Sequence, residues 1–252
     1  KGVEITLNIN ILMNYRGEGT RVDNRGIFAQ GVNFNAGGQI YGLSDGNIYI
    51  QGTKDSLNSI FNSQTTKSFL GVKYSKKNDY INENREKYKL SQLYGNAGIT
   101  IDAEGKLKVE GSDISSKGNI FLSGKLGTDI LPGTEAYSRY EEHKSIGFNG
   151  SLMGLLSGIE KTSIEKSKTE IINDKITNVG TRINSSEGKV EISGDTVYIQ
   201  GGKIGAKGEI ILDGRKGIVI ADALSYEKNE YNIEKHKIGV SGISGNIDTK
   251  NL

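Results

Sequence analysis

The sequence predicts an all-β fold of the β-solenoid type, and its composition and internal repeats carry that prediction. Glycine accounts for 35 of the 252 residues, whereas proline occurs once. Isoleucine occurs 32 times and alanine only 8 times. Because Ala is the best helix former and β-branched Ile favours strands, this balance argues against a helical bundle.

Composition also excludes several kinds of function. The chain has no Cys, which removes disulfide frameworks, thiolate metal sites and cysteine nucleophiles. Its 32 basic and 30 acidic residues leave a net charge of +2, so we expect no nucleic acid among its partners. No uncharged apolar run reaches the roughly 18 residues that span a bilayer. Strand-like alternation begins directly after Lys1, which argues against a signal peptide and favours a slice of a longer protein.

Three tracts share one template of short alternating apolar strands punctuated by glycine: residues 19–52, 98–124 and 180–214. Equivalent glycines lie 20 residues apart, as Gly26 and Gly46, Gly98 and Gly118, and Gly188 and Gly208. This pattern is typical of a solenoid in which each turn of about 20 residues has three short strands and glycine corners. The chain length, less the segments between the tracts, predicts about seven to nine such turns.

The apolar positions inside the tracts predict which side chains face the core. They step by 5 and 6 residues, in Val109, Ile114 and Ile120 and again in Ile199, Ile204 and Ile210. We expect the last three to point inward. Polar neighbours are expected to point outward, namely Lys203, Lys207 and Glu209.

Two segments between the tracts, 53–95 and 125–178, are richer in Lys, Glu, Asn and Tyr and too long for simple corners. We interpret them as hairpins or loose excursions, with the solenoid resuming near Asn96 and Val179. Similar signatures recur at residues 67–71 (KSFLG), 144–148 (KSIGF) and 237–240 (KIGV). Residues 160–172 contain enough Glu and Lys for a short helix, but their Thr and Ile positions fit a polar strand pair better.

The order of features from Val179 to Ala223, followed by a Tyr-, Ser-, Glu- and Lys-rich stretch and by HKIGVSG, resembles the haemagglutinin repeats of two-partner-secretion exoproteins. That family includes filamentous haemagglutinin and the contact-dependent growth inhibition effectors. Residues 179–242 match best, 96–150 well, and 19–74 with a looser centre. The resemblance implies a right-handed parallel β-helix. It further implies one β-helical segment of a longer filament over residues 1–252, with repeat copies near 19–95, 96–178 and 179–252.

The same resemblance implies a function. It indicates a structural and interaction segment of a secreted, cell-surface filamentous exoprotein on the exterior of a Gram-negative outer membrane, serving as a virulence-associated adhesin or as a contact-dependent toxin-delivery shaft. The implied partners are an outer-membrane transporter of the two-partner-secretion type during export, and a host or bacterial cell-surface receptor (protein, glycan or outer membrane). Two other classes stay open: a β-helix enzyme that degrades polysaccharide, and a phage-fibre-type β-solenoid that forms an intertwined trimer.

Residues that carry catalytic chemistry are few. His143 and His236 occupy the same position in two repeat copies, whereas a catalytic centre is normally single, so we expect a repeat-surface role for both. Two carboxylate pairs also occur, Glu83/Glu86 and Glu141/Glu142. They would suit a glycosidase, but in a polar excursion they are typical of solvated side chains. The P-loop, G-x-S-x-G, H-E-x-x-H and calcium-binding nonapeptide motifs are absent, so we expect no enzyme activity, no cofactor and no metal.

Two stretches are candidates for surface contact. The first combines cations with an aromatic ring, as a glycan-binding loop does, and comprises Lys73, Tyr74, Lys76 and Lys77. The second is the apolar stretch Ile146–Ile159, interpreted as a contact with a membrane or a partner, with Phe148, Leu152, Met153, Leu155 and Leu156 as its contact residues. The alternatives are an edge strand kept soluble by lysines and packing along the flank of the solenoid. The excursion tyrosines, among them Tyr80, Tyr88 and Tyr140, allow the same two interpretations, exposed contact or side packing.

Overall fold

The computed structural model describes residues 4–7, 11–15, 26–69, 72–149, 163–239 and 246–251. Every regular element in these ranges is a β-strand, so the predicted all-β class is confirmed. The chain divides into two compact units. The first comprises Lys1–Asp55, Lys87–Glu135 and Thr177–Ser225, and the second comprises Ser56–Glu86, Ala136–Ile176 and Tyr226–Leu252.

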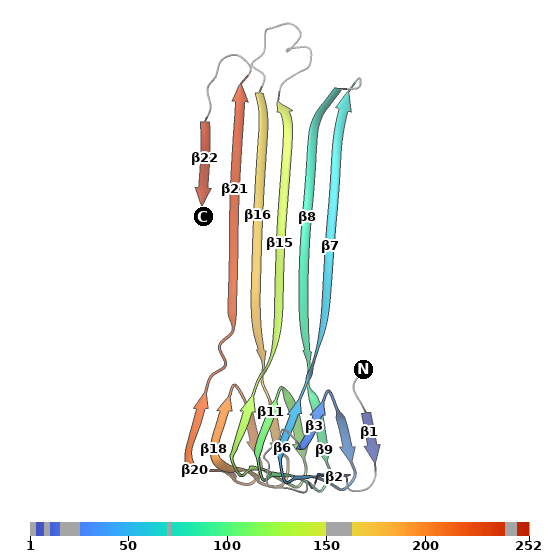
Figure 1. Ribbon diagram of the computed structural model, residues 1–252, viewed down its shortest axis with the longest axis vertical. Helices are drawn as coiled ribbons and strands as arrows, with labels where there is room; N and C mark the ends of the chain where they lie inside the picture. Colours follow the sequence, from blue (N-terminus) through green and yellow to red (C-terminus); the bar gives the residue numbers. More distant parts are fainter. Residues whose placement is uncertain are drawn as a thin grey trace. The chain divides into compact units, whose positions relative to one another are not determined.

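The first unit is built from sets of three short strands, called triplets here, that follow one another along the chain (Figure 1). The first four are β1 (Glu4–Leu7), β2 (Ile11–Tyr15) and β3 (Gly26–Gln30); β4 (Asn33–Ala36), β5 (Gln39–Ser44) and β6 (Asn47–Gln51); β9 (Ser91–Gly95), β10 (Gly98–Ala103) and β11 (Lys106–Glu110); and β12 (Ser112–Ser116), β13 (Asn119–Gly124) and β14 (Gly127–Leu131). In the last two, one continuous strand fills the second and third places: β17 (Arg182–Ser185) with β18 (Val190–Gln200), and β19 (Lys203–Ala206) with β20 (Ile210–Ala221).

Equivalent strands of successive triplets pair in parallel and form two sheets. The first strands make a six-stranded sheet in the order β1-β4-β9-β12-β17-β19. The others make a ten-stranded sheet in the order β2-β5-β10-β13-β18-β14-β11-β6-β3, with β20 paired to β18. Strand β18 therefore joins the second-strand and third-strand parts of this sheet.

Corresponding residues of directly successive triplets mostly lie 21 residues apart, so the predicted spacing of 20 is one residue short. The register pairs are Ile27 with Ile48, Leu93 with Ile114, and Ile183 with Ile204. The pairs β1–β4 and β2–β5 are exceptions, because Glu4 lies opposite Asn33 and Ile11 opposite Ile40, 29 residues apart. The glycine spacing gave the wrong repeat length because equivalent glycines do not pair with one another: Gly98 pairs with Asn119 and not with Gly118. A step of 20 does occur between Val190 and Ile210, and one extra residue in the middle of β20 restores 21 for the rest of the strand.

This register aligns aliphatic side chains into columns that fill the core. One column runs through Ile40, Ile99, Ile120 and Val190, all at most 1% exposed. Parallel neighbours repeat at about 4.8 Å, so each apolar side chain packs on an equivalent one above and below. Each fully buried Ile or Leu contributes about 1.5–3 kcal/mol by leaving water.

Ile210 continues that column, yet it is 47% exposed, so its predicted burial is wrong. Among the described strands β20 pairs with β18 alone, and its other edge therefore has no strand beside it. Ile204, on the edge strand β19, is half-buried for the same reason, whereas Ile199 is buried as predicted. The polar residues predicted to point outward are exposed: Lys203, Lys207 and Glu209.

Alternate triplets end in two different ways. Gly31, Gly111 and Gly201 follow β3, β11 and β18 with φ of 59°, 47° and 55°, a region that glycine adopts without a Cβ penalty, and the chain turns directly into the next triplet. After β6, β14 and β20 the chain instead enters the long strands β7 (Thr53–Phe69), β15 (Gly133–Asn149) and β21 (Tyr226–Gly239). The described residues hold six triplets and not seven to nine, because these long strands use more of the chain than expected.

Hydroxyl groups satisfy buried backbone atoms where the chain returns to the core. The Ser91 hydroxyl donates to the carbonyl of Gln51 (2.6 Å) and accepts from the Val32 N–H (3.1 Å). Thr181 repeats the arrangement, donating to the Leu131 carbonyl (2.6 Å) and accepting from the Ser112 N–H (3.3 Å). These bonds offset the cost of burying polar groups at the corner.

Tyr88, in β8 (Val72–Lys89), is 7% exposed, so the contact interpretation of this tyrosine is wrong. Its hydroxyl accepts from the Gly52 N–H (3.0 Å) and donates to the Glu110 carbonyl (3.3 Å). A Cβ at Gly52, Gly111 or Gly133 would overlap its ring. The ring thus fills space that three glycines leave open, and burial raises the pKa of Tyr88 to about 12.

The second unit is a six-stranded sheet in the order β22-β21-β16-β15-β8-β7, completed by β16 (Ser163–Val179) and β22 (Asn246–Asn251). The pairs β8–β15, β16–β21 and β21–β22 are antiparallel, and Figure 1 shows the long strands side by side. Residues 163–172 form a strand and not a helix, which confirms the strand prediction for this part of the chain. The predicted excursions 53–95 and 125–178 are too wide, because β9 and β14 belong to the parallel sheets.

Candidate contact surface on the antiparallel sheet

Side chains of the antiparallel sheet alternate between two faces along each strand. The register pairs Ile146 with Lys76, and Ile164 with Ile238, so each pair shares a face. Across β15 and β16, hydrogen bonds and ion pairs join even-numbered residues to even-numbered ones, as in Tyr140 with Glu170, and odd-numbered residues to odd-numbered ones, as in Ser145 with Ser167. We call the face with Ile146, Ile164 and Ile238 the isoleucine face, and the opposite one the histidine face, after His143.

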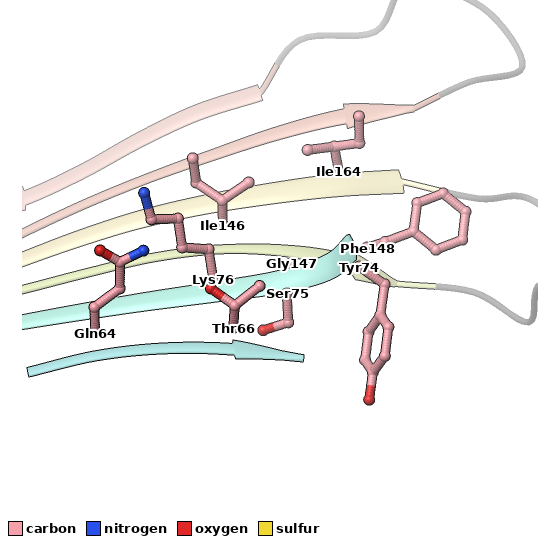
Figure 2. A pocket seen from close by; sticks show the side chains of 9 residues that line it. All are labelled: Gln64, Thr66, Tyr74, Ser75, Lys76, Ile146, Gly147, Phe148 and Ile164. Atoms are coloured by element: carbon pink, nitrogen blue, oxygen red, sulfur yellow. The ribbon is translucent and has the colours of Figure 1, made fainter. Parts of the chain in front are cut away.

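A shallow pocket of about 380 Å³ lies where β7 and β15 end and where β8 and β16 begin. It is lined by Gln64, Thr66, Tyr74, Ser75, Lys76, Ile146, Gly147, Phe148 and Ile164, and we call it the strand-end pocket. Figure 2 shows Ile146, Ile164 and Lys76 projecting from the same side of the strands, with Phe148 at the end of β15 and the Tyr74 ring extending in another direction. A Cβ at Gly147 would meet nothing within 4 Å, so the structure has free space for a side chain at this position.

The structure brings together residues that the sequence analysis had placed in two separate candidate stretches. Tyr74 and Lys76 of the first and Phe148 of the second line the same pocket. Lys77 is exposed but, being the next residue along the strand, lies on the histidine face. Lys73 lies in β8, and its side chain is outside the described part of the chain. The remaining candidates fall at residues 150–162, also outside the described residues: Leu152, Met153, Leu155 and Leu156.

Sequence reasoning missed Gln64, Thr66 and Ile164 as pocket residues, whereas Ile146 begins the apolar stretch that it had named as a contact candidate. The recurrent Lys, Ile and Gly signature also places Ile146 near the end of β15 and Ile238 next to the end of β21. Gln64, Thr66 and Ile164 belong to neighbouring strands, and their proximity depends on strand order and register. No local sequence pattern reports that proximity.

Polar groups beyond the pocket on the isoleucine face are linked across strands. The Tyr140 hydroxyl donates to Glu170 Oε1 (3.0 Å), and Lys168 Nζ lies 2.6 Å from the same carboxylate and 3.8 Å from Glu142. The hydrogen bond from Lys168 lowers the pKa of Glu170, and desolvation, with the bond to Glu170, raises the pKa of Tyr140. The Tyr140 ring packs against Tyr80 with centroids 6.0 Å apart, so these two tyrosines pack on the sheet.

The histidine face carries a second linked cluster. His143 Nδ1 lies 2.8 Å from Asp79 Oδ1, and its Nε2 lies 3.2 Å from Glu141 Oε2. Arg139 Nε approaches Glu141 Oε1 at 2.6 Å and Arg139 Nη1 lies 3.7 Å from Glu83. Hydrogen bonding to Asp79, and then to Glu141, raises the pKa of His143 above its ordinary value. This cluster holds charge partners in place and leaves His143 partly exposed.

The candidate catalytic pairs do not converge. The Ser145 and Ser167 hydroxyls are 2.7 Å apart, which puts His143, two residues before Ser145, on their face. His236 pairs with Lys166, next to Ser167, and so lies on the other face. The neighbours Glu141 and Glu142 likewise point to opposite faces, and the three-residue step does the same for Glu83 and Glu86. Neither carboxylate pair can flank one glycosidic bond.

Among the described residues, no group of three or more His, Asp or Glu side chains could hold a metal ion. No helix long and apolar enough to cross a membrane is found in the same residues. The chain matches no protein-family model, and comparisons with curated proteins and with solved structures give no significant match.

Proposed function

We propose that the chain is a parallel β-helical segment of a secreted, cell-surface filamentous exoprotein, and that it presents the antiparallel sheet as a contact surface. In this proposal the stacked triplets give mechanical support. The strand-end pocket and the residues around it meet a receptor on a host or bacterial cell.

The register of the triplets carries the proposal. Strands of six triplets pair with equivalent strands of the next in parallel, and the residues that repeat at each level are those that fill the core. A stack of this kind gains stability from each neighbouring level, which suits an extendable support. Side chains such as Ile101 and Leu122 fill the buried columns.

The composition of the antiparallel sheet supports a contact role for it. Its strands bury few side chains, and apolar residues such as Ile146 and Ile164 stand 47% and 43% exposed. Exposed apolar side chains gathered in one place are typical of interaction sites. The rival class, a polysaccharide-degrading enzyme, needs a cluster of acids around one bond, and the described carboxylate pairs point to opposite faces.

The test is binding of the fluorescently labelled chain to intact Gram-negative bacteria and to cultured epithelial cells, measured by flow cytometry. We expect saturable binding that falls about tenfold or more when Tyr74→Ser and Phe148→Ser are combined, because aromatic side chains supply much of the binding energy at contact sites. The matched control combines Phe28→Ser and Tyr226→Ser, which are also exposed aromatics but lie outside the pocket. Absence of binding to any cell, or release of new reducing ends from acidic polysaccharides, would contradict the proposal.

A further inference from the structure

Three exposed isoleucines form a row across adjacent strands on the isoleucine face. Ile146, Ile164 and Ile238 are 47%, 43% and 64% exposed. Each lies within three residues of a strand end, at Asn149 of β15, Ser163 of β16 and Gly239 of β21. Figure 2 shows the first two on the same side of the sheet, and the register puts the third opposite Ile164. We call these three residues the isoleucine row.

Lysines flank this row on the same face. In residues 72–79, 143–148, 163–167 and 235–239, the ends of the four central strands, the sequence has seven Lys and two acidic residues, Asp79 and Glu165. Alternation and register place three of these lysines, and neither acidic residue, on the isoleucine face. We call the three the lysine band: Lys76, Lys144 and Lys166, all exposed.

The charge reverses in the next part of the same four strands. Residues 80–86, 136–142, 168–174 and 228–234 contain eight acidic and four basic residues, a balance of −4. The positive charge is therefore concentrated at the strand ends, beside the isoleucine row and the strand-end pocket. Its concentration there is not explained by the composition of the sheet.

We propose that the isoleucine row and the lysine band bind an anionic lipid bilayer. The proposal names the partner of the contact surface described above and rests on that function. An anionic bilayer binds apolar side chains that enter its headgroup boundary and lysines beside them that meet the lipid phosphates. A protein partner fits less well, because Lys is depleted from protein–protein interfaces. A glycan partner would stack on aromatic rings, but the three isoleucines are more exposed than the neighbouring Tyr74 and Phe148.

Binding combines two contributions that can be separated. The isoleucines act through burial of apolar area, which depends little on salt. The lysines act through the surface potential of the bilayer, which is screened within about 8 Å at physiological ionic strength. Binding should therefore need anionic lipid and weaken, without vanishing, as salt rises.

The test is co-flotation of the full chain with vesicles of phosphatidylcholine and phosphatidylglycerol, compared with vesicles of phosphatidylcholine alone. We expect affinity for the anionic vesicles about tenfold or more above that for the neutral ones. Combining Ile146→Thr, Ile164→Thr and Ile238→Thr should lower it about tenfold, and so should combining Lys76→Gln, Lys144→Gln and Lys166→Gln. Thr keeps the β-branch of Ile, and Gln keeps an unbranched stem one atom shorter than that of Lys, so strand formation is preserved.

Matched control variants change equally exposed residues of the first unit. One combines Ile210→Thr, Ile218→Thr and Ile220→Thr, which are 47%, 45% and 69% exposed, and the other combines Lys106→Gln, Lys203→Gln and Lys207→Gln. We expect both to bind like the unchanged chain. Equal binding to neutral and anionic vesicles, no binding to either, or an equal loss in the controls would overturn the inference. Binding to cells without binding to vesicles would overturn the lipid inference alone, whereas binding to vesicles without binding to cells would overturn the proposed function alone.

Discussion

Replacing Ile120 by Ala should destabilise the chain far more than replacing Ile210 by Ala, although both belong to the same column of the core. Ile120 has strand neighbours on both sides and is 0% exposed, whereas Ile210 has Val190 on one side only and is 47% exposed. The two substitutions remove the same atoms and the same β-branch. Their difference therefore reports how completely each position is enclosed.

The magnitude follows from burial. Losing three methyl or methylene groups from a fully buried site costs about 2.4 kcal/mol in transfer free energy, and the cavity left behind raises the total to about 3–4 kcal/mol. Because Ile210 is already about half exposed, its replacement loses only about half of the transfer free energy and leaves no closed cavity. The expected cost is about 1 kcal/mol.

Urea unfolding followed by circular dichroism measures both losses, and an unchanged m value would show that the two variants unfold over the same surface. Because stacked repeats are stabilised by nearest neighbours, amide exchange after Ile120→Ala should increase mainly around Ile99 and Val190. Equal losses for the two variants would refute the reasoning. They would mean that the column does not stack in the described register, and the β-helical proposal would lose its support.

Two further predictions concern the sheets. Hydrogen bonding to Asp79 raises the pKa of His143 above 6.5. The stability that His143 contributes is therefore complete below pH 6.5 and is lost as the pH rises through the raised pKa. His143→Gln should flatten this part of a curve of urea midpoint against pH, and an unchanged curve would contradict the hydrogen bonding described for His143. Gly111→Ala should lower the free energy of unfolding by about 2 kcal/mol or more, because φ is 47° and the new Cβ would overlap the Tyr88 ring. Gly147→Ala, with nothing within 4 Å of its Cβ, should change it by no more than about 0.5 kcal/mol; similar melting temperatures for the two variants would show that the Tyr88 packing is wrong.

Several features of the fold were within reach of the sequence. The excess of Ile over Ala, with glycine at regular intervals, predicted an all-β chain, and the steps of 5 and 6 residues placed Val109, Ile114 and Ile120 in the core, where all three are 0% exposed. These inferences succeeded because alternation within a strand is a local property, set by a side-chain period of two. The spacing between glycines failed by one residue because a corner glycine can shift along the chain while the strands stay in register.

What only the tertiary structure decided is which distant residues meet. His143 and Asp79 are 64 residues apart and yet hydrogen-bonded, and Tyr74 and Phe148 line one pocket from different strands. His143 and His236 look equivalent in the sequence but lie on opposite faces, because the signature at residues 237–240 lacks the residue that corresponds to Ser145. A shift of one residue moves a side chain to the other face of a sheet. Sequence periodicity therefore determined which residues alternate, and strand order and register, which are properties of the whole sheet, determined the site.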